Sequence, residues 1–117
     1  MLLVVGLSIS SRYFFSVSNF LNILPATSVI GVLAIGETFV ISAAGIDLSI
    51  GSLLAFSGVV GAQAIVVLGF PWPLGILACL GAGLLAGLLN GTLVARAGVP
   101  PFIVTLGMLG ILRGFTQ

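Results

Sequence analysis

Five side chains of this 117-residue sequence carry a charge and are the first candidates for chemistry: Arg12, Glu37, Asp47, Arg96 and Arg113. The sequence has no histidine, and its single cysteine is Cys79. Zinc clusters, disulfide frameworks and histidine-based acid–base catalysis all require residues that this set does not supply. We therefore expect no catalytic residue, no metal site and no cofactor in this chain.

Glu37 lies near the middle of a long apolar run, where a carboxylate is costly if the run crosses a membrane. Three interpretations are open: a polar residue that lines a pathway, a hydrogen-bonding group between helices, or a proton-coupling acid. A proton-coupled carrier would usually show several such acids, and this sequence has one in its apolar runs. Asn90 lies in a later run, where we expect it to form an interhelical hydrogen bond.

Asp47 lies in a short stretch between two apolar runs. Gly45 is expected to end the preceding helix in the left-handed conformation, and Asp47 to cap the next one. Ser49 and Ser52 are further candidate caps. A contact of Asp47 with a substrate or a partner is the alternative, and spacing alone leaves it open.

The composition defines the class of protein that must position these residues. Hydrophobic residues make up 60% of the chain and charged residues only 4%, whereas a soluble domain carries about 25% charged residues. Such a chain cannot build a polar shell, and it is too hydrophobic to be disordered. A net charge of +1 gives no electrostatic basis for nucleic-acid binding. The composition therefore predicts an integral membrane protein in contact with lipid.

The apolar runs are long and apolar on all sides, which is typical of membrane helices and not of the alternating strands of a barrel. We predict an all-α, polytopic bundle of transmembrane helices that is incomplete at both ends. Pro25 fits the start of the first full span. The predicted segments are a partial span at 1–11, an interfacial segment at 13–24, full spans at about 25–46, 50–70 and 72–95, and an incomplete span at 99–117.

Glycines recur at every fourth position in the third full span, at Gly83, Gly87 and Gly91. Small residues at this spacing let membrane helices approach one another closely. We expect this ridge to pack against another helix, with Gly87 at the centre of the contact. A moving contact in a transport cycle is the functional alternative.

Several strings of the sequence, taken in order, resemble those of one known family. The stretch Gly45-Ile46-Asp47-Leu48-Ser49-Ile50-Gly51-Ser52 resembles a signature of that family. The downstream strings Asn90-Gly91 and Pro101-Phe102-Ile103-Val104-Thr105-Leu106-Gly107-Met108 resemble it in the same order. This family comprises the permease subunits of ribose-type ABC sugar importers, and the resemblance runs from about Phe20 to Gly114.

This resemblance implies a multi-pass protein of the bacterial inner membrane that performs no chemistry on the sugar. It also implies three partners: a cytoplasmic ABC ATPase, a periplasmic sugar-binding protein, and a second permease subunit, identical or not. Two alternatives stay open. One is a permease of the related branched-chain amino-acid importers, and the other is a small self-contained membrane protein that oligomerises through its glycine faces.

Overall fold

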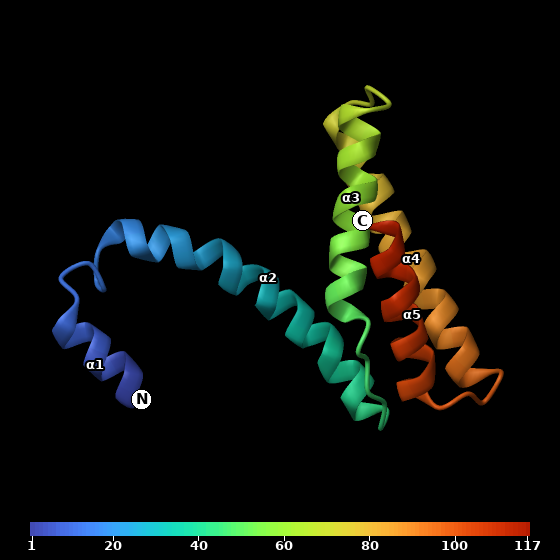
Figure 1. The fold of residues 1–117 in the computed structure, drawn as a ribbon, viewed down its shortest axis with the longest axis horizontal. Helices are drawn as coiled ribbons and strands as arrows, with labels where there is room; N and C mark the ends of the chain where they lie inside the picture. The colour runs from blue at the N-terminus through green and yellow to red at the C-terminus, as the bar shows by residue number, and fades with distance from the viewer. The chain divides into compact units, whose positions relative to one another are not determined.

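The computed structural model describes all 117 residues, and it is entirely helical (Figure 1). The absence of strands confirms the predicted all-α class. The structure divides into two compact units, residues 1–39 and 40–117, which are described separately below. The helices are α1 (Leu2–Ser10), α2 (Val17–Ser42), α3 (Ile50–Val66), α4 (Trp72–Ala95) and α5 (Pro101–Phe115).

In the first unit, α2 begins earlier than the sequence predicts. The hydroxyl of Ser16 accepts a hydrogen bond from the backbone N–H of Asn19 (3.2 Å), which caps the first turn. Pro25 therefore lies inside the helix, and the expectation that it starts a helix is wrong. Proline removes one backbone hydrogen bond there, a loss that membrane helices tolerate. Residues 17–24 of the segment expected to be interfacial are part of this helix.

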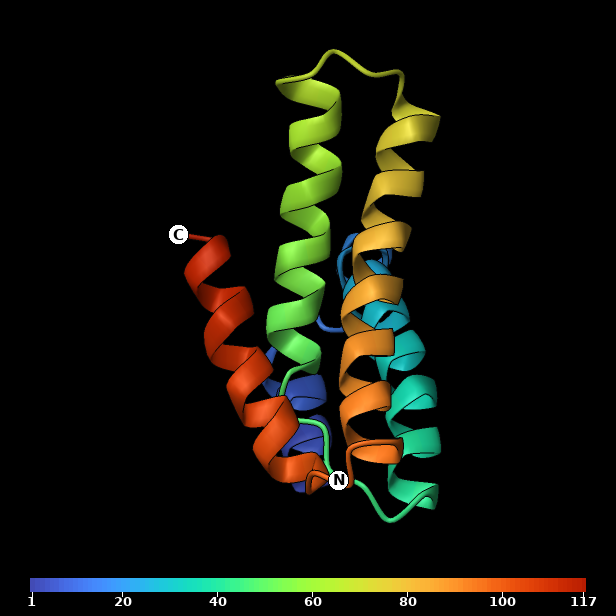
Figure 2. The ribbon, with the colours of Figure 1, turned by 90° about the vertical axis from the view of Figure 1, so that its right-hand side faces the viewer.

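The second unit is built around an antiparallel hairpin of α3 and α4 (Figure 2). The two backbones approach each other at Gly61 and Gly75. A Cβ placed on Gly61 would lie 3.0 Å from the Gly75 carbonyl oxygen, and one on Gly75 would lie 3.2 Å from the Gly61 carbonyl oxygen. Because side chains at these positions would separate the helices, the two glycines are required for the close contact.

The predicted contact at Gly87 is not present between α3, α4 and α5. Gly83 lies near Ser57 of α3, but a Cβ on Gly87 or Gly91 would meet nothing within 4 Å. The reason is helical geometry: Gly87 and Gly91 follow the buried residues Ala86 and Asn90 by one position, and one residue turns the helix by about 100°. The face of α4 that is buried against its neighbours instead carries Gly75, Ala86 and Asn90.

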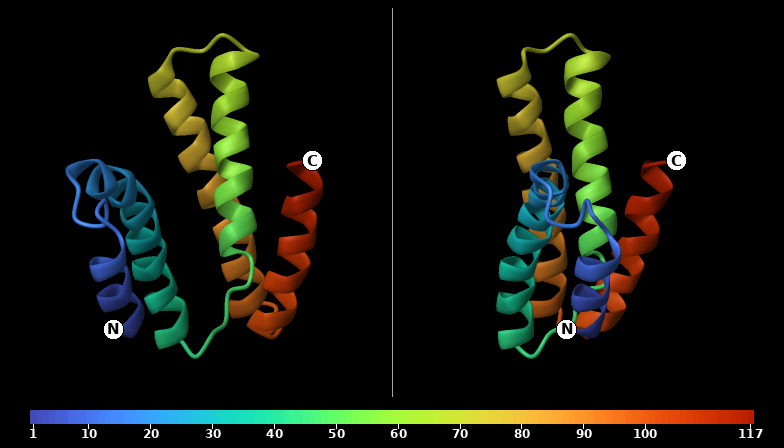
Figure 3. Two further views of the ribbon diagram at one scale, coloured as in Figure 1. Left: turned by 60° about the vertical axis from the view of Figure 1, so that its left-hand side comes forward. Right: turned by 90° about the vertical axis from the view of Figure 1, so that its left-hand side faces the viewer.

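α5 packs against α3 and, to a lesser extent, against α4, and the views in Figure 3 show it beside the first half of α3. The rings of Phe56 and Phe115 meet at its far end, with centroids 6.1 Å apart. Pro100 and Pro101 begin α5, where a missing N–H costs nothing.

Only α2 and α4 are long and apolar enough to cross a membrane by themselves. α4 covers the range predicted for the third span. α3 has 17 residues and ends at Val66, four residues before the predicted limit, because Gly69 turns the chain with a φ of 69°. α2 ends at Ser42, also four residues early, and the chain between α2 and α3 is consequently non-helical.

Candidate functional site

The connector between α2 and α3, residues 43–49, contains most of the stretch that the sequence singles out. It begins with a Schellman motif, in which Gly45 N–H donates to the Val40 carbonyl (2.9 Å) and Ala44 N–H to the Ile41 carbonyl (2.9 Å). The left-handed residue is Ala44, with a φ of 57°. The prediction that Gly45 adopts this conformation is therefore wrong by one position.

Gly45 serves a different purpose in this motif. A Cβ on Gly45 would lie 3.1 Å from both Cγ1 and the carbonyl oxygen of Val40, and 3.8 Å from Cβ of Pro101 in α5. The absence of a side chain thus lets the connector fold back onto the end of α2 and pass close to the start of α5.

Asp47 organises the second half of the connector. Its Oδ1 accepts hydrogen bonds from the backbone N–H of Ser49 (2.7 Å) and from the Ser49 hydroxyl (2.6 Å). Ser49 is the residue immediately before α3, so Asp47 stabilises the entry to the helix without capping its first turn. The Ser49 side chain makes no capping hydrogen bond to α3, and the hydroxyl of Ser52 donates back to the Ser49 carbonyl (2.8 Å). The expected capping by Ser49 and Ser52 is therefore wrong.

Asn90 of α4 reaches the connector from the other side of the hairpin. Its Nδ2 donates to the Ser49 hydroxyl oxygen (3.1 Å), and the two side chains are almost fully buried, at 7% and 0% exposure. A hydrogen-bonded chain thus runs from Asn90 through Ser49 to Asp47. It joins two parts of the sequence that are 41 residues apart.

Thr105 of α5 makes a second long-range hydrogen bond to the same connector. Its hydroxyl lies 3.2 Å from the Ile46 carbonyl oxygen and shares its hydrogen with the Pro101 carbonyl (2.9 Å) one turn earlier. The side chain is only 4% exposed. Sequence reasoning assigned Thr105 no role, although a lone hydroxyl in an apolar run was a signal that it needs a partner.

The direction of the chain from Asn90 to Asp47 follows from the number of available hydrogens. An ionised carboxylate can only accept, so the single hydroxyl hydrogen of Ser49 is directed to Asp47. Ser49 can then only accept from Asn90, which places the Asn90 NH₂ group toward Ser49. The Asn90 oxygen, Oδ1, is buried and has no hydrogen-bond partner.

Glu37 lies in the first unit, on α2, and its Oε2 is also shielded from solvent without a partner. Glu37 and the connector belong to different units, whose relative placement is not determined. Its three interpretations are therefore not distinguished.

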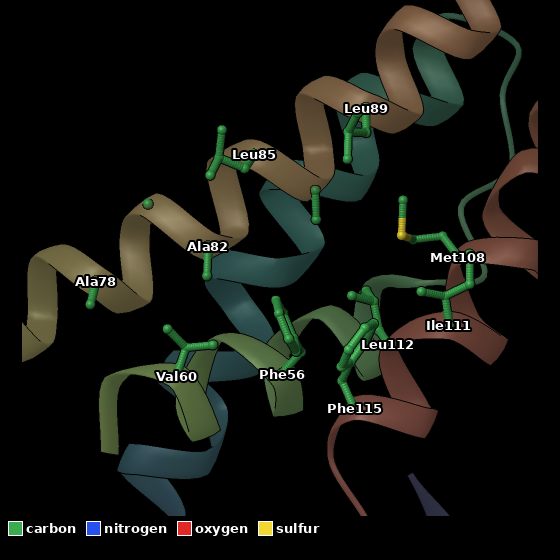
Figure 4. A pocket seen from close by; sticks show the side chains of 12 residues that line it. Phe56, Val60, Ala78, Ala82, Leu85, Leu89, Met108, Ile111, Leu112 and Phe115 are labelled. Carbon is green, nitrogen blue, oxygen red and sulfur yellow. The ribbon is translucent and has the colours of Figure 1, made fainter. Parts of the chain in front are cut away.

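A wide apolar groove of about 630 Å³ lies between α3, α4 and α5 (Figure 4). Phe56 projects into it from α3, Leu85 from α4, and Met108 and Phe115 from α5. No charged side chain lines it, so it offers shape and hydrophobicity but no polar recognition. The long-range side-chain hydrogen bonds of the second unit are made to the connector instead.

Comparison with known proteins identifies the family. The family described as "Branched-chain amino acid transport system / permease component" matches residues 19–117, and the chain therefore belongs to this family of permeases. No solved structure matches the chain significantly.

Three curated relatives are named as sugar permeases, which confirms the resemblance found in the sequence. The chain is 50% identical to the xylose transport system permease of Escherichia coli K12 over 108 residues, 89% of this chain and 28% of that protein. It is 45% identical to the ribose import permease of Haemophilus influenzae over 116 residues, 99% of this chain and 36% of that protein. It is 46% identical to the fructose import permease of Rhizobium meliloti over 99 residues, 85% of this chain and 28% of that protein. The chain thus spans about a third of the length of these relatives.

Proposed function

We propose that this chain forms part of the transmembrane permease subunit of an ATP-driven importer of monosaccharides such as ribose, xylose or fructose. The observation that supports this most directly is the 45–50% identity to permeases for three different sugars. A permease acts by binding and conformational change, so no catalytic residue is required of it. ATP hydrolysis would take place on a separate subunit.

The proposed partners follow from the same assignment. They are an ABC ATPase on the cytoplasmic side, a periplasmic sugar-binding protein, and a second permease subunit that completes the pathway. The proposed location is the bacterial inner membrane, in which α2 and α4 cross the bilayer and α3 and α5 pack as shorter helices.

Within this function we assign the connector the role of a fixed structural centre. Gly45, Asp47 and Ser49 shape it, and Asn90 and Thr105 attach it to α4 and α5. A break between helices that is held at several points can keep its shape while neighbouring helices move.

A branched-chain amino-acid permease is the second candidate, because the description of the matching family names that substrate class. The two candidates differ in the chemistry of the ligand. An amino acid carries a carboxylate and an ammonium group, whereas a monosaccharide is neutral and rich in hydroxyl groups.

A chimeric permease would test the assignment. The ribose import permease of Escherichia coli K12 aligns with all 117 residues of this chain at 42% identity, so its matching segment can be replaced by this chain. We expect the chimera to restore uptake of labelled ribose in cells that lack their own ribose permease but retain the ATPase and binding protein.

The parent permease is the positive control, and the strain without a permease is the negative one. Uptake no higher than in the negative control, with the chimera present in the membrane at the parent's level, would contradict the sugar assignment. In the second arm, this chain replaces the matching segment of a leucine permease. If only this second chimera transports its substrate, the amino-acid alternative is favoured.

A further inference from the structure

The tip of the α3–α4 hairpin, residues 66–72, is an exposed apolar surface. Figure 2 shows it at the end of the hairpin that lies opposite the connector and the start of α5. The large side chains of the tip are 47–80% exposed: Val66, Val67, Leu68, Phe70 and Trp72. No charged residue occurs between Asp47 and Arg96, so neither the tip nor the helices that carry it offer a charge to water. A contiguous apolar surface of this kind indicates a partner other than water.

A hydrogen-bonded turn defines the conformation of the tip. The backbone N–H of Phe70 donates to the Ala64 carbonyl (3.0 Å), and Gly69, with a φ of 69°, turns the chain between the two helices. Pro71 follows in an extended conformation, and Trp72 is the first residue of α4. The exposure of Phe70 and Trp72 is therefore a property of the fold and not of a loose loop.

The length of α4 places Trp72 at the surface of a bilayer. The 24 residues of α4 span about 36 Å, whereas the hydrocarbon core is about 30 Å thick and the headgroup layers extend it to about 40–45 Å. In the proposed location, in which α4 crosses the bilayer, each end of the helix therefore lies about 3 Å beyond the core, within a headgroup layer. Arg96, directly after the other end, opposes a change of this depth, because a shift of Trp72 into water would draw the guanidinium toward the core.

The chemistry of the tip suits a headgroup layer better than water or the hydrocarbon core. Tryptophan combines a large apolar ring with one N–H donor, and such rings gather at both membrane–water interfaces. The indole N–H of Trp72 has no hydrogen-bond partner in the protein, and lipid ester and phosphate oxygens are acceptors that it can reach at that depth. Because the tip carries no cation, its attraction to lipid requires no anionic headgroup.

We propose that residues 66–72 form a lipid anchor, in which the tip of the α3–α4 hairpin inserts into the headgroup layer of one leaflet with Trp72 and Phe70 among the headgroups. The partner is the uncharged part of the lipid interface, and this end of the hairpin is consequently closed to soluble proteins. The inference rests on the membrane location in the proposed function and adds to it the depth at which the hairpin is held.

Trp72 is the only tryptophan of the chain, so its fluorescence reports on the tip alone. The full chain is reconstituted in phosphatidylcholine nanodiscs in which a fraction of the lipid carries bromine, a quencher, on acyl carbons either near the headgroup or near the chain end. Acrylamide, which is uncharged, is the quencher on the water side. We expect the largest loss of fluorescence with bromine near the headgroup, a smaller loss with bromine near the chain end, and a shallower acrylamide dependence than free tryptophan shows. Brominated lipid should quench equally in nanodiscs that also contain phosphatidylglycerol, because no charge takes part.

Phe70→Asp and Ala97→Asp form a matched pair of variants. Both add one negative charge at an exposed position, the first in the tip and the second in the turn between α4 and α5. Phe70→Asp should move the tip toward water, with less quenching by bromine near the headgroup and a steeper acrylamide dependence, whereas Ala97→Asp should change neither. Circular dichroism shows whether each variant keeps its helicity. Leu68→Asp, at another exposed side chain of the tip, carries the same expectation as Phe70→Asp and takes its place if that variant loses helicity.

The proposal is overturned if acrylamide quenches Trp72 as steeply as free tryptophan while brominated lipid does not, because the tip would then lie in water and be open to a soluble partner. Stronger quenching from the chain end than from near the headgroup also overturns it, as does quenching by brominated lipid only when phosphatidylglycerol is present. An equal response of the folded tip variant and Ala97→Asp would show that the tip is not what holds this depth.

The outcome is separate from that of the proposed function. Ribose uptake by the chimera together with a water-exposed Trp72 would remove the anchor and leave the sugar assignment standing. Absence of uptake together with quenching near the headgroup would do the reverse.

Discussion

Ala44 and Gly45 should respond in opposite directions to substitutions that exchange their residue types. A non-glycine residue in the left-handed region costs about 1–2 kcal/mol, and Ala44 has a φ of 57°. Glycine at this position removes that cost but adds about 0.5–1 kcal/mol of unfolded-chain entropy. We therefore expect Ala44→Gly to raise the free energy of unfolding by about 0.5–1 kcal/mol, the difference between these two effects.

Gly45→Ala should be destabilising. The new Cβ would lie 3.1 Å from the Val40 carbonyl oxygen, which is the acceptor of the Gly45 N–H bond, and 3.1 Å from Val40 Cγ1. The side chain of Val40 can rotate, but the carbonyl is part of the Schellman motif and cannot move without lengthening that bond. Overpacking of this kind costs about 1–3 kcal/mol.

Reversible unfolding in mixed micelles, with increasing sodium dodecyl sulfate and helicity followed by circular dichroism at 222 nm, measures both changes. Gly31→Ala is the control, because this exposed helical glycine has nothing within 4 Å of its Cβ position. The reasoning is refuted if Ala44→Gly lowers the stability, or if Gly45→Ala is as harmless as Gly31→Ala.

Three further predictions concern the second unit and use the same unfolding assay. Gly61→Ala should lower the stability by about 1–3 kcal/mol, because its Cβ would lie 2.9 Å from Cβ of Cys79. Gly87→Ala should leave the stability unchanged or slightly raise it, since nothing lies within 4 Å of its Cβ position. Equal effects of the two substitutions would contradict the packing described for α3 and α4. Thr105→Val should lower the stability by about 1 kcal/mol through loss of the hydrogen bond to the Ile46 carbonyl, whereas Thr105→Ser should stay close to wild type. Thr92→Val, at an exposed position, is the control. An unchanged stability of Thr105→Val would mean that this hydrogen bond contributes nothing. Asp47→Ala should lower the stability by about 1–3 kcal/mol, because the backbone N–H and the hydroxyl of Ser49 lose their acceptor. Asp47→Asn keeps an acceptor oxygen and should lower the stability less. A larger loss of stability for Asp47→Asn would show that the charge itself stabilises the connector.

The parts of the fold that were predictable from sequence are those with local signals. α4 lies between Pro71 and Arg96, and proline at one end with a charge at the other defines its range. The early start of α2 also has a local signal, the Ser16 cap, whereas Pro25 alone favours a later start.

The early end of α2 could not be read from the sequence, because two small residues stand side by side there. Glycine is the expected left-handed residue, yet in this chain the close approach to Val40 requires the missing side chain at position 45. Alanine, which is the next smallest residue, then takes the left-handed conformation at position 44. A glycine can serve either a left-handed conformation or a close approach of the backbone. Which of the two it serves depends on its neighbours in the three-dimensional structure.

The sequence predicts the connector as a turn with a capping aspartate, whereas in the structure Asp47 is one end of a long-range hydrogen-bonded chain. A cap is local, and several residue types can serve as one. The chain from Asn90 through Ser49 to Asp47 is not local, because it needs a pure acceptor at one end so that every hydrogen points toward it. A carboxylate at position 47 therefore determines the orientation of an amide 43 residues later and leaves the oxygen of that amide without a partner.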